Sequence, residues 1–161
     1  MDSAAVPPEV RAQLDSPNPE DAVRGLARLR SLALSTGDFG LLEQVNVPAS
    51  TAAVADGRIS AGLLESGRVL AGFNILLTRV AAEADVGPAQ AVVAVTASTP
   101  AYQERDATGV VLAQAAAGPE QRLRLVLAQV EGRWRIQDIL PAADTEEPGN
   151  TRVPGSGSSG G

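Results

Sequence analysis

The segment Leu123-Arg124-Leu125-Val126-Leu127, followed by Glu131-Gly132-Arg133-Trp134-Arg135-Ile136, decides the fold of this chain. On both sides of Glu131-Gly132, apolar and polar residues alternate, which is the pattern of strands that bury one face. A two-residue connection that ends in glycine is typical of a tight hairpin turn. The sequence therefore predicts an antiparallel hairpin at this point.

The residues upstream of this hairpin continue the strand pattern. Residues 69–78 alternate between a more apolar and a less apolar face, residues 89–99 are rich in valine, and residues 110–115 form a weaker strand pattern. The turn residues Asp85-Val86-Gly87-Pro88 and Gly118-Pro119 separate these runs, and Pro100 bends the chain after the second run. Consecutive strands joined by short turns predict an antiparallel meander of four to five strands.

The first half of the chain has a helical pattern. Asn18-Pro19-Glu20-Asp21 has the signals of a helix start, and Gly37 ends that helix. We expect Asp38 to cap a short second helix over residues 39–45. Ser50 and Gly67 bracket a third helix over residues 51–66, which we expect to cover the sheet with four inward side chains: Ala52, Ala55, Ile59 and Leu63. Helices that precede a meander predict an α+β fold.

The composition of the two ends sets the expected domain boundaries. Residues 1–18 contain three prolines and only a short helical patch, so we expect an N-terminal tail. Residues 142–161 are rich in Gly, Ser, Pro and acidic residues, and too few apolar groups are present to offset the entropy of ordering them. A single α+β domain over residues 19–141 is therefore expected.

Missing residue types exclude several kinds of chemistry. The chain has no histidine and no cysteine, and all 13 of its basic residues are arginine. Disulfides, thiol nucleophiles, histidine-based triads, lysine Schiff bases and Cys/His metal sites are thereby excluded. The net charge of −6 argues against binding of nucleic acids or of anionic membrane surfaces. We expect no cofactor and no metal site.

Without these residue types, acid–base chemistry would depend on carboxylates or Tyr102. The aspartates nearest the expected elements are Asp38, Asp56, Asp106 and Asp138, and each has a structural explanation: a helix cap, a neighbour of Arg58, a turn residue and a strand residue. Asp138 is the alternative catalytic candidate because it would share a strand face with Ile136. A bulge before Ile139 would instead turn Asp138 outward.

Three aromatic residues are the candidates for ligand binding: Phe39, Tyr102 and Trp134. Core packing is the more usual role for Trp134, as it is for Phe73. Tyr102 follows the bend at Pro100, and its hydroxyl needs a partner or water, which favours a pocket mouth or an interface.

The final hairpin resembles that of the nuclear-transport-factor-2-like fold, the cone shared with ketosteroid isomerase and scytalone dehydratase and related to the cystatin-like fold. There a strand of the pattern found at residues 132–136 commonly ends the domain. The resemblance implies N-terminal helices on a curved, cone-like antiparallel sheet with an open-ended pocket. The catalytic His–Asp pair of its dehydratases and cyclases does not transfer, because this chain has no histidine.

A narrower resemblance rests on three segments: residues 22–30, Asn46-Val47-Pro48-Ala49-Ser50, and Ala53-Val54-Ala55-Asp56. They are similar to segments of uncharacterised actinobacterial domains. The resemblance implies a domain outside the membrane that follows a single span, in some cases behind a kinase-like portion. A cytoplasmic location is the alternative.

We therefore expect a non-catalytic extracytoplasmic module that binds a protein or senses a small ligand. The alternative is an isomerase, cyclase or dehydratase that uses a buried carboxylate in the cone. A deep, open pocket with a carboxylate and a second polar group would favour the enzyme, and a cone filled by Leu, Ile and Trp134 would contradict it. A homodimer formed through sheet faces is a further expectation.

Overall fold

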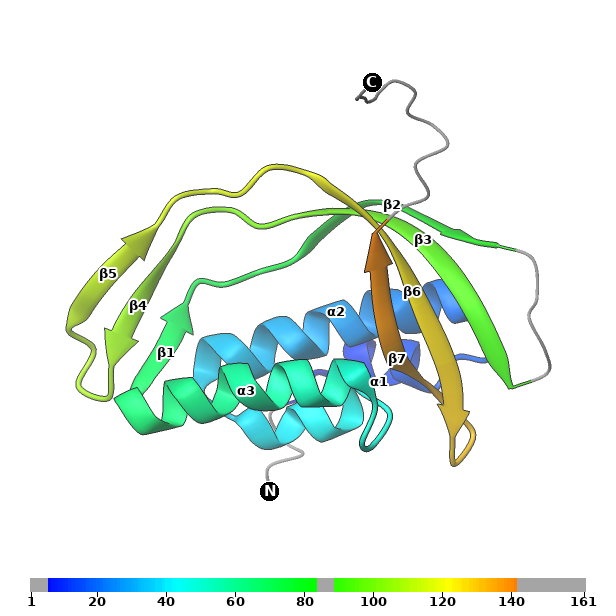
Figure 1. The fold of residues 1–161 in the computed structure, drawn as a ribbon, viewed down its shortest axis with the longest axis horizontal. Coiled ribbons are helices and arrows are strands. Elements are labelled where there is room, and N and C mark those ends of the chain that lie inside the picture. Colours follow the sequence, from blue (N-terminus) through cyan, green and yellow to red (C-terminus); the bar gives the residue numbers. More distant parts are fainter. Residues whose placement is uncertain (1–5, 84–88, 142–161) are drawn as a thin grey trace, which may run out of the picture.

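The computed structural model describes residues 6–83 and 89–141, which form helices followed by antiparallel strands (Figure 1). The helices are α1 (Pro8–Leu14), α2 (Pro19–Thr36), the 3₁₀-helix η2 (Phe39–Gln44) and α3 (Thr51–Ser66). The strands are β1 (Arg68–Ala71), β2 (Leu76–Ala82), β3 (Gln90–Ser98), β4 (Tyr102–Asp106), β5 (Val111–Ala115), β6 (Gln121–Val130) and β7 (Arg133–Pro141). The expected turn at 85–88 and the expected tail at 142–161 lie outside the described residues.

The strands of the described ranges form two sheets, in the orders β1-β4-β5 and β2-β3-β6-β7. Figure 1 shows that β1 leads into β2, β3 into β4 and β5 into β6, so that three long strands each bend once and β7 adds a fourth. The bends lie at Gly72, where φ is +82°, at Pro100 and near Gly118-Pro119. The predicted α+β fold is confirmed, but these bends divide the meander into two sheets of shorter strands.

The final hairpin forms at the predicted place. Val130 pairs with Arg133, and the turn residues Glu131 and Gly132 have φ values of +54° and +83°. Two positive φ values are those of a type I′ turn, whose twist matches that of the strands it joins. The sequence signal was sufficient here because the turn and the alternation are both local.

The helix boundaries were also predicted by local signals. The side chain of Asn18 accepts a hydrogen bond from the Glu20 amide at 2.8 Å, and that of Ser50 accepts one from the Ala53 amide at 3.1 Å. Gly37 and Gly67 end their helices in the left-handed conformation. Asp38 occupies the N-cap position of η2, as expected, but its side chain makes no capping hydrogen bond.

The main cover of the sheet is α2 rather than α3. Eight residues of α2 are buried, and this helix contacts β1, β2, β3 and β7. In α3 only Ala52 and Asp56 are buried, while the expected inward residues Ala55 and Ile59 are exposed. The reason is that α2 lies in the concavity of the sheet, whereas α3 contacts only its rim at β1 and β7.

The folded body begins earlier than expected. Val6, Val10 and Leu14 are 7%, 3% and 3% exposed, so residues 6–18 do not form a tail. The helices α1 and α2 touch at Gly25, where a Cβ atom would lie 2.8 Å from Cβ of Gln13. A seven-residue helix is unstable alone, so α1 depends on this contact. No local pattern in the sequence predicts the contact.

The core under the four-stranded sheet is filled by apolar side chains of β3, β6 and β7. Val93 and Leu127 are fully buried, and Trp134 and Ile136 are 7% and 6% exposed. The indole Nε1 of Trp134 donates a hydrogen bond to the Pro17 carbonyl at 2.9 Å, which fixes the ring in the core. Among the described residues, no helix is long and apolar enough to span a membrane.

Candidate ligand-binding site

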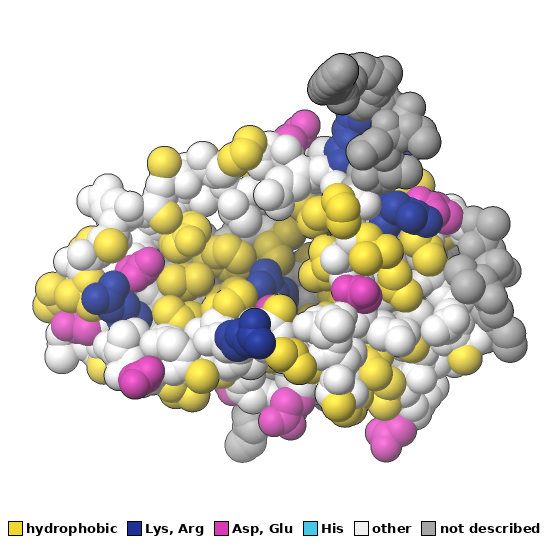
Figure 2. All heavy atoms as spheres, viewed as in Figure 1, with side chains coloured by type: hydrophobic (Ala, Val, Ile, Leu, Met, Phe, Trp, Pro, Cys, Tyr) yellow, Lys and Arg dark blue, Asp and Glu magenta, His cyan; other side chains and the backbone are white. Residues whose placement is uncertain are grey.

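The wide end of the cone is hollowed between α2 and the bends of the strands. Figure 2 shows a depression on this face, with hydrophobic side chains on its walls. A cavity of about 200 Å³ lies here, lined by Arg30, Phe73, Ile75, Ala97, Ser98, Thr99, Gly118, Pro119, Gln121 and Leu123. We call it the cone hollow. Since most of its wall is apolar and one charged side chain lines it, its chemistry suits a largely apolar ligand.

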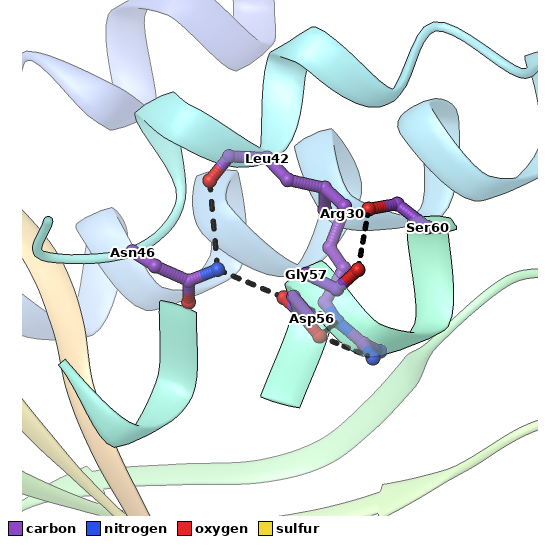
Figure 3. A network of polar contacts seen from close by, with 6 residues as sticks. All are labelled: Arg30, Leu42, Asn46, Asp56, Gly57 and Ser60. Atoms are coloured by element: carbon purple, nitrogen blue, oxygen red, sulfur yellow. Dashed lines mark hydrogen bonds and ion pairs between the residues drawn. The ribbon is translucent and has the colours of Figure 1, made fainter. Parts of the chain in front are cut away.

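The charged residue of the cone hollow belongs to a polar network (Figure 3). Arg30 of α2 faces Asp56 of α3: Nε lies 3.2 Å from both carboxylate oxygens and Nη2 lies 2.9 Å from Oδ1. The amide of Asn46 donates to Oδ2 of Asp56 at 2.9 Å. Three separate parts of the chain therefore meet at one buried carboxylate.

The network occupies both oxygens of Asp56. Asp56 is 7% exposed, and the side chain of Arg30 is 22% exposed. A buried carboxylate of this kind must be paired, because an isolated charge in an apolar interior is very costly. A carboxylate held by a guanidinium and an amide is not placed to take a proton from a substrate.

A second cavity lies on the other side of this network. Its volume is about 450 Å³, and it lies between η2, the loop that follows, the first half of α3 and Arg135 of β7. Phe39, one of the ligand-binding candidates, lines this cavity. We call it the loop cavity.

The three aromatic candidates do not come together. Trp134 belongs to the core, and Tyr102 packs edge to face on Phe73 with the ring centroids 5.4 Å apart. Tyr102 also lines an open depression of about 450 Å³ over β1, β4 and β5. Phe39, Tyr102 and Trp134 thus lie in three different places, and Phe39 and Tyr102 line two separate cavities.

The catalytic alternative at Asp138 is not supported by the geometry. Leu127 pairs with Ile136, but its neighbour Val126 pairs with Asp138, so the register shifts by one residue between them. Because successive residues of a strand point to opposite faces, this bulge places Asp138 on the face opposite Ile136. Its Oδ1 accepts a hydrogen bond from the Ile139 amide at 2.8 Å.

The turn assignment of Asp106 is correct. Its Oδ1 accepts hydrogen bonds from the Thr108 hydroxyl at 2.7 Å, the Thr108 amide at 2.9 Å and the Val110 amide at 3.0 Å. The hydrogen bond from the Thr108 side chain, followed by that from the Val110 backbone, lowers the pKa of Asp106 below 3.8. This carboxylate organises the connection between β4 and β5.

The pairing of Asp56 was missed because its partner is distant in the sequence. Arg58, the expected neighbour, is two positions away and thus points to another side of the helix. A signal was nevertheless present: Asp56 lies four residues after Ala52, one of the residues expected to face inward, and residues four apart share a helix face. In residues 6–83 and 89–141, no three acidic side chains are grouped to hold a metal ion.

No protein-family model matches the chain, and no curated protein matches it. Among solved structures, it is similar to the intermembrane space region of the chloroplast protein ARC6, with a TM-score of 0.54, 14% identity and coverage of 77% of this chain and 95% of that one. It is also similar to Aln2 from a Streptomyces species, with a TM-score of 0.50, 18% identity and coverage of 81% of this chain and 93% of that one.

A third similar structure is an uncharacterised protein with a cystatin-like fold from Caulobacter vibrioides. It has a TM-score of 0.46, 18% identity and coverage of 78% of this chain and 90% of that chain. At these identities the likeness concerns the fold alone. The chain shares with the first two structures an α+β fold of helices on curved antiparallel strands, in agreement with the fold class that the sequence predicts.

Proposed function

We propose that this domain is a non-catalytic module that binds a small, mostly apolar ligand in the cone hollow. The observation that carries the proposal is the contrast between the two sides of Arg30. Its Nε and Nη2 are committed to Asp56, so the carboxylate is neutralised, while the wall of the adjacent hollow is mainly apolar. Such a hollow favours binding over acid–base chemistry.

The ligand would carry one hydrogen-bond acceptor. The Nη1 atom of Arg30 makes no hydrogen bond with the described residues, and Arg30 lines the hollow. Since the charge of Arg30 is already balanced by Asp56, a neutral acceptor such as a ketone oxygen is favoured over a second anion. The volume of about 200 Å³ suits a ligand with one ring.

Acetophenone is a suitable probe, since it joins an apolar ring to a ketone. We expect its addition to shift the backbone amide resonances of residues that line the cone hollow. The variant Ala97→Phe should abolish these shifts, because Ala97 lines the hollow and a phenyl group would fill it. The matched control is Ala94→Phe on the opposite face of β3, which should leave binding intact. Shifts scattered over the whole surface, or equal loss in both variants, would refute the proposal.

We further propose that the module is extracytoplasmic and belongs to a membrane-anchored actinobacterial protein. This proposal is supported by the resemblance of residues 22–30, 46–50 and 53–56 to such domains. A β-lactamase fusion to the natural full-length protein in an actinobacterial host tests it. The proposal predicts resistance to ampicillin, because the fused enzyme protects the cell only when it lies outside the membrane. Sensitive cells that contain the intact fusion would contradict it.

A homodimer is also proposed, although through the edge of the three-stranded sheet rather than through the sheet faces that the sequence analysis expects. β5 pairs only with β4 among the described strands, and Val110, Val111 and Leu112 on it or beside it are 55%, 42% and 43% exposed. An uncharged apolar edge strand is prone to pair with another strand. Light scattering should report a dimer that Val111→Lys converts to a monomer. A monomer of the unaltered chain at high concentration would contradict this.

A further inference from the structure

The loop cavity is a second candidate for ligand binding. Apolar side chains of Phe39, Pro48 and Ala53 form part of its wall, and its volume of about 450 Å³ can hold a small organic molecule. The pair of Arg30 and Asp56 separates it from the cone hollow. Two polar side chains of its lining contain an atom that has no hydrogen-bond partner among the described residues. In one side chain this atom is a donor, and in the other it is an acceptor.

The donor is the guanidinium of Arg135. Its Nη1 donates to the Glu43 carbonyl at 3.0 Å, but its Nε is buried and has no hydrogen-bond partner among the described residues. Within those residues Arg135 also forms no ion pair, in contrast to Arg133, which lies 2.6 Å from Asp15. The guanidinium of Arg135 therefore lines the cavity with a charge that no acidic side chain of the described residues pairs.

The acceptor is the side-chain oxygen of Asn46. This residue is 4% exposed; its Nδ2 donates to Asp56 at 2.9 Å and to the Leu42 carbonyl at 3.5 Å. Its Oδ1 accepts no hydrogen bond from the described residues and points away from Asp56 (Figure 3). The backbone of Asn46 forms a bridge to Ile136, the residue that follows Arg135, so the donor and the acceptor lie on neighbouring segments.

The charges around the cavity favour an anion beside Arg135. Asp56 also lines the cavity, but its charge is balanced by Arg30. Glu43, the other acidic residue of the lining, is exposed, so water screens its charge. Arg135 therefore remains the unbalanced charge nearest the buried part of the wall.

We propose that the loop cavity binds a small carboxylate with an apolar side chain and a hydrogen-bond donor on the carbon next to the carboxylate. The carboxylate accepts from the guanidinium of Arg135, and the neighbouring hydroxyl or N–H donates to Oδ1 of Asn46. The side chain packs on Phe39 and Pro48. An α-hydroxy acid and an N-acyl amino acid share this chemistry.

The test uses the 161-residue chain and two probes, 2-hydroxy-4-methylpentanoate and N-acetyl-leucine, in calorimetric titrations. We expect at least one of them to bind and Arg135→Gln to weaken that binding about 10-fold or more, because a hydrogen bond to a charged group is lost. Arg133→Gln is the matched control, with the same charge change on the same strand, and should change the affinity less than about 2-fold. Absence of binding by both probes, or equal weakening in the two variants, would overturn the proposal.

A third probe, 4-methylpentanoate, tests the role of Asn46 without any substitution. It keeps the carboxylate and the side chain but lacks the donor, so it should bind about 5-fold or more weakly. Equal affinity would overturn the assignment of Asn46. Amide shifts at Ala49 and Ala53, rather than at Phe73 and Ala97, would distinguish this site from the cone hollow.

Discussion

The ion pair between Arg30 and Asp56 is the most buried of the ion pairs between described residues. Replacing Arg30 by Gln leaves a buried carboxylate without its cation, which costs far more than the pair itself contributes. The side chains of Arg30 and Asp56 are only 22% and 10% exposed. We therefore expect Arg30→Gln to lower the free energy of unfolding in urea by about 3 kcal/mol. Equilibrium denaturation followed by circular dichroism measures this change.

The control lies two residues away on the same helix. Arg28 pairs with Glu9 at 3.2 Å, but their side chains are 46% and 75% exposed, so Arg28→Gln should cost less than about 1 kcal/mol. If the two variants lost the same stability, the network would be a surface feature with no special role.

A second prediction at the scale of single residues concerns the protonation of Asp106 at low pH. Its pKa in the folded chain is lowered below 3.8, first by the Thr108 hydroxyl and then by the Val110 amide. A lowered pKa means that the carboxylate stabilises the fold fully above 3.8, and that this contribution disappears as the pH falls through the folded value. A carboxyl-carbon NMR titration should therefore give a midpoint below 3.8.

Two variants of Thr108 separate the causes of the lowered pKa of Asp106. Thr108→Ala removes the largest one and should raise the pKa of Asp106 toward 3.8, whereas Thr108→Ser keeps the hydroxyl and should leave it low. An unchanged midpoint in Thr108→Ala would show that the hydroxyl is not the main cause.

At the scale of elements, the contact of α1 with α2 can be tested through glycine. In Gly25→Ala the added methyl would lie 2.8 Å from Cβ of Gln13 and 3.1 Å from the Leu14 amide nitrogen, so one helix must shift. We expect a loss of about 1–3 kcal/mol in the free energy of unfolding, despite the better helix propensity of alanine.

Gly62 provides the opposite case in α3. A methyl group there meets nothing within 4 Å, so Gly62→Ala should stabilise the domain by about 0.5–1 kcal/mol. Both variants are compared by urea denaturation. A gain in both would mean that α1 does not pack closely on α2 in solution.

The elements also show which parts of the fold a sequence can predict. The caps at Asn18 and Ser50 and the turn at Glu131-Gly132 were predicted because each is decided by residues close to one another in the chain. The break of the first long strand at Gly72, the packing of α1 and the inward face of α3 were not, because each depends on a distant partner. A buried aspartate in α3 becomes acceptable only once Arg30, 26 positions earlier, lies opposite it.

At the scale of the whole molecule, the candidate sites were less predictable than the fold. Phe39, Tyr102 and Trp134 are rare residues that attract attention in the sequence, yet they lie in three separate places. The polar atoms that could contact a ligand belong to Arg30, Asn46 and Arg135. These side chains become candidates only because the fold buries them beside cavities. Burial is a property of the assembled cone, and composition alone does not report it.

The extent of the folded body gives the last prediction. Deleting residues 1–18 removes the buried side chains of Val6, Val10 and Leu14, each of which contributes about 1.5–3 kcal/mol. It also removes the carbonyl of Pro17 that holds the indole of Trp134. The summed loss is comparable with the whole stability of an ordinary domain, so this variant should be largely unfolded at about 37 °C.

Deleting residues 142–161 instead should change the melting temperature by less than about 2 °C, because the composition of that segment predicts no contribution to a core. The fluorescence of Trp134, the only tryptophan of the chain, reports both outcomes. Its emission should move to longer wavelength in the N-terminal deletion and stay unchanged in the C-terminal one. A native-like spectrum and melting curve for the chain that begins at residue 19 would restore the boundary that the sequence predicted, and would mean that α1 covers a core able to close without it.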